Sequence, residues 1–151
     1  MNIPSREECL EILKENGTPS NVIEHCKTVC KVAEDVTNRL IKKDVNVNKD
    51  IVIAAALLHD IEREKKNHAV AGANLIKSMG FPQVAKVMQK HRLYMAGSEH
   101  VQPKTIEEKI VFYADKRSKG DIVVSLMERM EDLKKRYGKE FSKEFEIAKK
   151  I

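Results

Sequence analysis

The feature that most constrains the fold is an uninterrupted apolar run at residues 51–58, which ends directly before His59-Asp60. The run is eight residues long, far short of the roughly 20 residues that a helix needs to cross a bilayer. Its alanines favour a helix over a buried strand, and a helix that is apolar on all sides belongs at the centre of a fold. We therefore expect a buried central helix at about residues 49–60.

The rest of the chain divides into segments of helical length, separated by Gly, Pro and capping residues. No strand-like alternation, internal repeat or linker is visible. The pattern predicts an all-α fold, a single compact bundle of about six to eight helices across residues 1–151. The expected helices cover about residues 6–16, 20–40, 49–60, 67–79, 82–91 and 106–117, then a seventh around Leu126, Met127, Met130, Leu133 and Tyr137 and a short eighth around Phe141, Phe145 and Ile147.

Capping signals mark the ends of several of these helices. Thr105 and Glu108 have the spacing of a capping box, and Gly80 stands where a helix is expected to end. Residues 94–104 are expected to form the one substantial loop. The other expected N-caps are Ser20 or Asn21 for the second helix, Asn48 for the third and Asn67 for the fourth.

Composition and charge limit the class of partner. A chain of 151 residues can fold around one core without a disulfide or a structural metal. Its 28 basic and 23 acidic residues are interleaved, its net charge is +5, and aromatic residues make up 5% of it with no Trp. These properties argue against direct nucleic-acid binding and suit a small anionic partner.

The three cysteines, Cys9, Cys26 and Cys30, occur in a sequence with no secretory signal and no membrane-spanning run. An odd number of cysteines in this context indicates reduced thiols, a cytoplasmic location and no membrane partner. Cys26 and Cys30 lie four residues apart on one helical face, but no second pair completes a zinc site. We interpret them as core residues.

His59-Asp60 is the strongest local signal for chemistry. An ionised carboxylate at the end of a buried apolar helix is costly unless a cation pairs with it. A metal ion would meet that need, because it favours neutral imidazole together with ionised carboxylate. The alternative is that His59 caps the helix end and Asp60 faces water.

Four further residues are candidates by position. His25 borders the apolar stripe of its helix, and Asp115 ends an apolar helical segment. His68 begins one expected helix and His91 ends another; side chains from separate helices can converge at such ends. Taken singly, His25 can also be a hydrogen-bonded histidine of the core. Asp115 can also be an N-cap or a surface partner of the two cations that follow it, Lys116 and Arg117. His100 lies in a polar loop and is expected to be exposed.

The order His25, His59-Asp60, Asp115 resembles that of the HD-domain metal-dependent phosphohydrolase superfamily. Residues 56–61, Ala-Leu-Leu-His-Asp-Ile, resemble the core motif of the family, and residues 109–116, Lys-Ile-Val-Phe-Tyr-Ala-Asp-Lys, resemble its closing motif. The resemblance covers about residues 4–121, which we take as the motif-bearing core of a single domain. Helices from about residue 121 onward carry no recognisable chemistry.

His68 and His91 resemble the two extra histidines of the HDIG-type branch of the superfamily. Glu62 stands where that pattern has Gly, and Arg63 stands where it has Lys. The sequence is most similar to a small family of uncharacterised prokaryotic HD proteins, with HD enzymes that hydrolyse diadenosine tetraphosphate as more distant relatives.

The resemblance implies a metal centre and the residues that serve it. A mixed set of imidazoles and carboxylates suits Fe, Mn, Co, Ni or Zn, as one ion or two. With one ion, the two extra histidines would contact substrate phosphate or protonate the leaving group. The implied first-metal ligands are His25, His59, Asp60 and Asp115; the implied second-metal ligands are His68 and His91, with Asp60 bridging; the expected phosphate-binding cations are Arg63 and Lys116.

We therefore expect a metal-dependent phosphohydrolase that uses metal-activated water on a small phosphorylated compound, a nucleotide or dinucleotide. No nucleophile elbow, Walker-type loop or Cys-His catalytic arrangement is present in the sequence. The alternatives are a nucleotide- or metal-sensing module without turnover, a di-iron oxygenase and a helical interaction protein. The apolar stripe after residue 125 is interpreted as core or as the seam of a homodimer.

Overall fold

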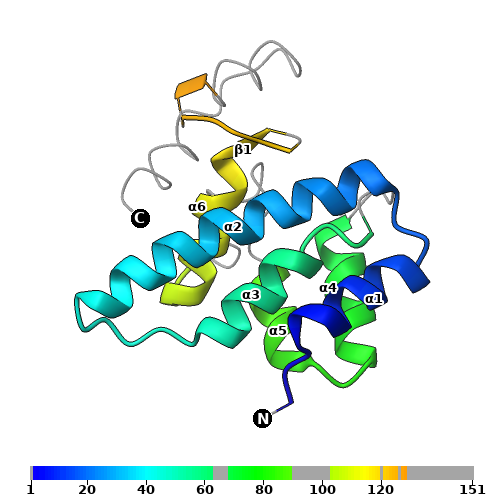
Figure 1. Ribbon diagram of the computed structural model, residues 1–151. Helices are drawn as coiled ribbons and strands as arrows, with labels where there is room; N and C mark the ends of the chain where they lie inside the picture. Colours follow the sequence, from blue (N-terminus) through cyan, green and yellow to red (C-terminus); the bar gives the residue numbers. More distant parts are fainter. Residues whose placement is uncertain (1, 63–67, 90–102, 120, 126, 129–151) are drawn as a thin grey trace.

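The computed structural model describes residues 2–62, 68–89, 103–119, 121–125 and 127–128. Within these residues the fold is all-α with one short hairpin, which confirms the predicted fold class (Figure 1). The elements are α1 (Arg6–Glu15), α2 (Ser20–Lys42), α3 (Lys49–Leu58), α4 (His68–Ser78), α5 (Pro82–Met88), α6 (Ile106–Lys116), β1 (Ser118–Lys119) and β2 (Ile122–Val123).

Helix α3 is the central helix, as the apolar run predicts. Seven of its residues are buried, and it packs against α1, α2, α5 and α6. Figure 1 shows α2 running the full width of the molecule across one side of α3, with α5 on another. Helices α3 and α6 both pack against α2 and against each other.

Side-chain caps start three of the helices. Asn48 Oδ1 accepts a hydrogen bond from the Ile51 amide at the start of α3 (3.2 Å), as predicted. Thr105 forms the predicted capping box with Glu108 at the start of α6, and Ser5 forms another at α1 that was not predicted. Each such cap stabilises its helix by about 1 kcal/mol.

The start of α2 differs from the prediction. Pro19, not Ser20 or Asn21, occupies the N-cap position, and no side chain caps the helix. Ser20 already lies inside the helix, because the proline carbonyl accepts from the amides of Val22 and Ile23, both at 3.0 Å. Proline at the cap fixes the turn that enters the helix, so a side-chain cap at the next residue has no role.

The prediction that the chain has no strands was wrong for the segment after α6. Ser118 pairs with Val123 and Lys119 with Ile122 in an antiparallel hairpin that packs against α2. The Gly-Asp pair between the strands and the β-branched residues after it are a hairpin signal in the sequence. The hairpin follows directly after the C-cap of α6 at Arg117.

Several expectations fall outside the described residues. They concern the N-cap Asn67, most of the 94–104 loop, the seventh helix beyond residue 128 and the whole eighth helix.

Gly80 does end α4 with a positive φ of 95°, as its position predicts. In the part of the chain that the structure describes, no helix is long and apolar enough to span a membrane.

Candidate metal centre

Three helices bring the predicted first-metal ligands together. His25 lies in the second turn of α2, His59 is the C-cap of α3, Asp60 follows it, and Asp115 is the penultimate residue of α6. The four residues are 5%, 0%, 1% and 6% exposed. They form a cluster, called here the HD cluster, whose ligand atoms all lie within 4.8 Å of one another.

Both imidazoles point the same nitrogen at the same two carboxylate oxygens. His25 Nε2 lies 3.1 Å from Asp115 Oδ1 and 3.4 Å from Asp60 Oδ2. His59 Nε2 lies 3.2 Å and 3.4 Å from the same two atoms. The two rings are tilted by 57°, with centroids 5.4 Å apart. The HD cluster is thus two nitrogens and two oxygens facing one point.

The tautomer of His59 follows from its other nitrogen. His59 Nδ1 lies 2.7 Å from the Ala56 carbonyl oxygen, which can only accept, so Nδ1 carries the proton. A neutral His59 then presents the lone pair of Nε2 to two carboxylates. Such an arrangement is favourable only when a cation lies between them.

The donor set fits a divalent transition metal. First-row ions bind imidazole nitrogen and carboxylate oxygen at about 2.0–2.2 Å, so neighbouring ligand atoms of one ion lie about 3 Å apart. The nitrogen–oxygen separations in the HD cluster are 3.1–3.4 Å. Its burial and its lack of thiolates suit Fe, Mn, Co, Ni or Zn in a site for chemistry.

The close approach of histidines and carboxylates in the HD cluster shifts the pKa values of His59 and Asp115. Burial favours neutral His59, but the Asp60 carboxylate and hydrogen bonds to both aspartates raise its pKa well above the usual value. Burial likewise disfavours ionised Asp115, but the Lys116 ammonium and the two histidines lower its pKa well below the usual value. The contacts that raise the pKa of His59 and lower that of Asp115 favour positive charge among the four ligand atoms.

The backbone after Asp60 is held by the loop between α1 and α2. The Ile61 carbonyl accepts from Asn16 Nδ2 and from Thr18 Oγ1, each at 3.3 Å. A Cβ on Gly72 of α4 would lie 3.3 Å from both Ile61 Cγ2 and Met88 Cε, so glycine lets α4 approach this turn without displacing those side chains. Asn16 lies at the end of the first expected helix, and nothing in the sequence around it predicts a hydrogen bond to the His-Asp turn.

The other predicted site residues are only partly described. His68 is the first residue of α4, and the structure describes its backbone position alone. His91, Arg63 and His100 lie outside the described residues. The second-metal set and the role of Arg63 stay predictions.

Lys116, expected to bind phosphate, lies beside the HD cluster but is turned inward. Its side chain is 3% exposed, and its Nζ donates to Asp115 Oδ2 at 2.6 Å. Its role as a phosphate ligand stays a prediction.

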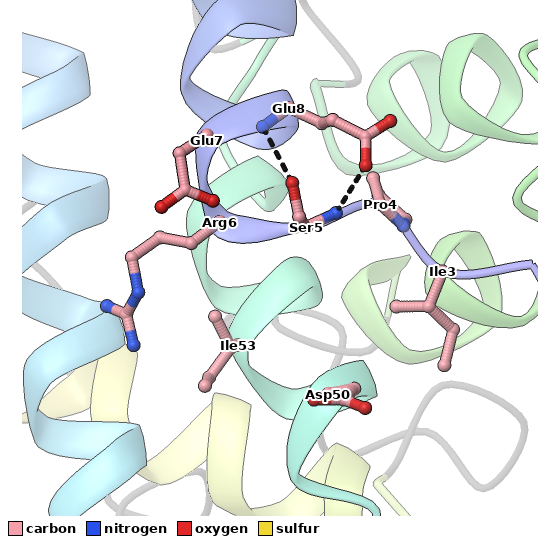
Figure 2. Close-up of a pocket in the computed structure, with 8 residues that line it drawn as sticks. All are labelled: Ile3, Pro4, Ser5, Arg6, Glu7, Glu8, Asp50 and Ile53. Carbon is pink, nitrogen blue, oxygen red and sulfur yellow. Dashed lines mark hydrogen bonds between the residues drawn. The ribbon is translucent and has the colours of Figure 1, made fainter.

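A separate cavity of about 480 Å³ lies at the start of α1 (Figure 2). Its lining includes Ser5, Glu8, Asp50 and Ile53, from the N-terminal halves of α1 and α3 and the N-cap of α1. The HD cluster is at the opposite end of α3, about 15 Å away along a ten-residue helix. Figure 2 shows Ser5 and Glu8 hydrogen-bonded to each other's backbone in the capping box, so their polar groups serve the helix.

Comparison with protein families gives the class of the chain. The HD domain model matches residues 22–120, which include all four residues of the HD cluster. The chain belongs to the HD-domain family. Family membership and the buried cluster together support a metal-dependent enzyme.

Curated relatives come from archaea. The chain is 34% identical to a tRNA (cytidine(56)-2'-O)-methyltransferase of Picrophilus torridus and 32% identical to that of Thermoplasma volcanium. These matches cover 85% and 89% of this chain but only 40% and 42% of the relatives, so the chain spans about two fifths of their length. An uncharacterised protein of Methanocaldococcus jannaschii is 31% identical, with 88% of this chain and 86% of that protein covered. No solved structure matches.

Proposed function

We propose that the protein is a metal-dependent phosphohydrolase that cleaves a phosphoester or phosphoanhydride bond of a small phosphorylated compound, a nucleotide or dinucleotide. The observation that carries the proposal is the convergence of His25 and His59 Nε2 on one oxygen each of Asp60 and Asp115. A divalent metal held there would supply Lewis acidity and lower the pKa of a bound water toward about 7.

Hydrogen bonds within the chain hold the proposed metal ligands in place. Ala56 fixes the tautomer and orientation of His59 through the Nδ1 hydrogen bond. The loop residues that bond to the Ile61 carbonyl hold the backbone that carries Asp60. Side chains fixed in this way need no rearrangement when substrate binds, which is the main protein contribution to electrostatic catalysis.

The charge of the cluster supports an anionic substrate. With both histidines neutral, Asp60, Asp115 and Lys116 together contribute one net negative charge. A divalent ion would leave the site with one net positive charge. A buried positive site attracts phosphate strongly, because the surrounding dielectric constant is low.

The experiment is metal analysis and a phosphoester screen on the purified chain, beside an Asp60→Ala variant and an Asp35→Ala control. Asp35 is an exposed carboxylate of α2 away from the site. We expect wild type and control to retain at least one ion per chain and to release phosphate, and Asp60→Ala to lose both. An Asp60→Ala protein that keeps its metal and full turnover would refute the proposal.

The names of two relatives favour a second candidate, a part in the 2'-O-methylation of tRNA. Retention of a tRNA transcript on a filter, at near-physiological salt and with a DNA duplex as control, tests it. Binding of the transcript alone, at a salt concentration where the duplex is released, would favour this candidate. Release of the transcript and the duplex at the same salt concentration would argue against this candidate and favour a small-molecule substrate.

A further inference from the structure

Lys116 differs from every other lysine that the structure describes, because it alone is buried. Its side chain is 3% exposed, although lysine is almost never buried without a partner. The other described lysines are exposed or half-buried, as on an ordinary solvated surface. A buried ammonium next to a metal-ligand cluster therefore calls for a specific role.

Two groups of α6 hold the ammonium in place. Lys116 Nζ donates to Asp115 Oδ2 at 2.6 Å and lies 5.1 Å from the centroid of the Phe112 ring. Phe112 is fully buried, one helical turn before Lys116. A cation between a carboxylate and an aromatic face is held electrostatically on both sides.

The two oxygens of Asp115 thereby have separate partners. Oδ1 faces Nε2 of His25 and Nε2 of His59, whereas Oδ2 faces Lys116. Rotation of the carboxylate would break the contacts of both oxygens at once. Asp115 therefore presents one oxygen to the point where the HD cluster converges, while Lys116 holds its other oxygen.

We propose that Lys116 is a positioning residue that keeps Asp115 a one-oxygen ligand of the metal. The inference rests on metal binding in the proposed function, and it assigns Lys116 to the metal ligand where the sequence suggested substrate phosphate. Hydrogen-bonded partners of metal ligands commonly change metal affinity by 10- to 100-fold when they are removed.

The test is a Co²⁺ titration of the metal-free chain, followed by visible absorption, which reports the number and geometry of ligands. Lys116→Met keeps the side-chain length and removes the ammonium, and Lys109→Met on the same helix is the matched control. We expect about tenfold weaker Co²⁺ binding and a changed spectrum in Lys116→Met, with the control unchanged. Lys116→Arg, which can still donate to Oδ2, should stay close to the wild-type spectrum.

Each outcome decides one question. A wild-type chain that binds no Co²⁺ would defeat the proposed function itself. A Lys116→Met spectrum and affinity equal to wild type would overturn the positioning role alone. A Lys116→Met variant with a raised KM for a phosphoester and an unchanged spectrum would also overturn the positioning role. That result would instead support Lys116 as a ligand of the substrate phosphate.

A crystal structure of the Zn²⁺-loaded wild type keeps the proposal testable if Lys116→Met does not fold. Asp115 bound through Oδ1 alone, with Lys116 Nζ on Oδ2, is the expected result. Both carboxylate oxygens on the ion, or the ammonium turned away from Asp115, would contradict the proposal.

Discussion

At the scale of single residues, the buried thiols show how the core controls ionisation. Burial raises the pKa of Cys9 to about 12 and that of Cys30 to about 11. Because the thiolate is the reactive form, we expect both thiols of the folded chain to react with a disulfide reagent at pH 8 at least about tenfold more slowly than in urea. Equal rates in the two states would contradict this burial.

The same raised pKa values predict how stability depends on pH. The folded state keeps these thiols neutral, so their contribution to the free energy of unfolding is complete below the usual pKa of 9.0 and is lost as the pH rises through about 11 to 12. Urea unfolding at several pH values between 8 and 11 measures the decline. A Cys9→Ala/Cys30→Ala variant should show a smaller decline over that range.

At the scale of elements, the loop between α1 and α2 supports the His-Asp turn. Thr18→Val removes the hydroxyl that donates to the Ile61 carbonyl, and Thr28→Val removes a hydroxyl bond within α2. We expect Thr18→Val to cost about 1 kcal/mol of stability and to weaken Co²⁺ binding, because the turn carries Asp60. Thr28→Val should leave Co²⁺ affinity unchanged; equal affinity in both variants would show that the turn needs no such support.

How far the sequence predicts these elements depends on how local their signals are. Asn48 and Thr105 cap helices through their own neighbours, so their positions were predictable. The hairpin of β1 and β2 was missed, because its two-residue strands show too little alternation to support the turn signal of the Gly-Asp pair between them. The Asn16 and Thr18 bonds join residues more than 40 positions apart, and no periodicity encodes them.

At the scale of the whole molecule, α3 connects the hydrophobic core to the HD cluster. Leu57 is 2% exposed, whereas Ile53 on the same helix is half-buried. We expect Leu57→Ala to cost about 2–5 kcal/mol in urea unfolding and Ile53→Ala distinctly less. A loss for Ile53→Ala as large as that for Leu57→Ala would contradict the central position of α3.

The membership of the HD cluster was predictable from residue order, because His59-Asp60 ends the most apolar helix and the family pattern supplied His25 and Asp115. The geometry was not: whether His25 borders the core or faces the carboxylates depends on how α2 crosses α3 and α6. The inward turn of Lys116 depends on the Phe112 ring beneath it, which spacing alone does not reveal.

The central claim is that His25, His59, Asp60 and Asp115 hold a metal ion. Anomalous diffraction from crystals soaked in Mn²⁺ or Zn²⁺ tests it most directly. We predict a peak about 2.0–2.2 Å from His25 Nε2, His59 Nε2, Asp60 Oδ2 and Asp115 Oδ1. No peak between these atoms, with the same ion bound elsewhere on the chain, would contradict the claim.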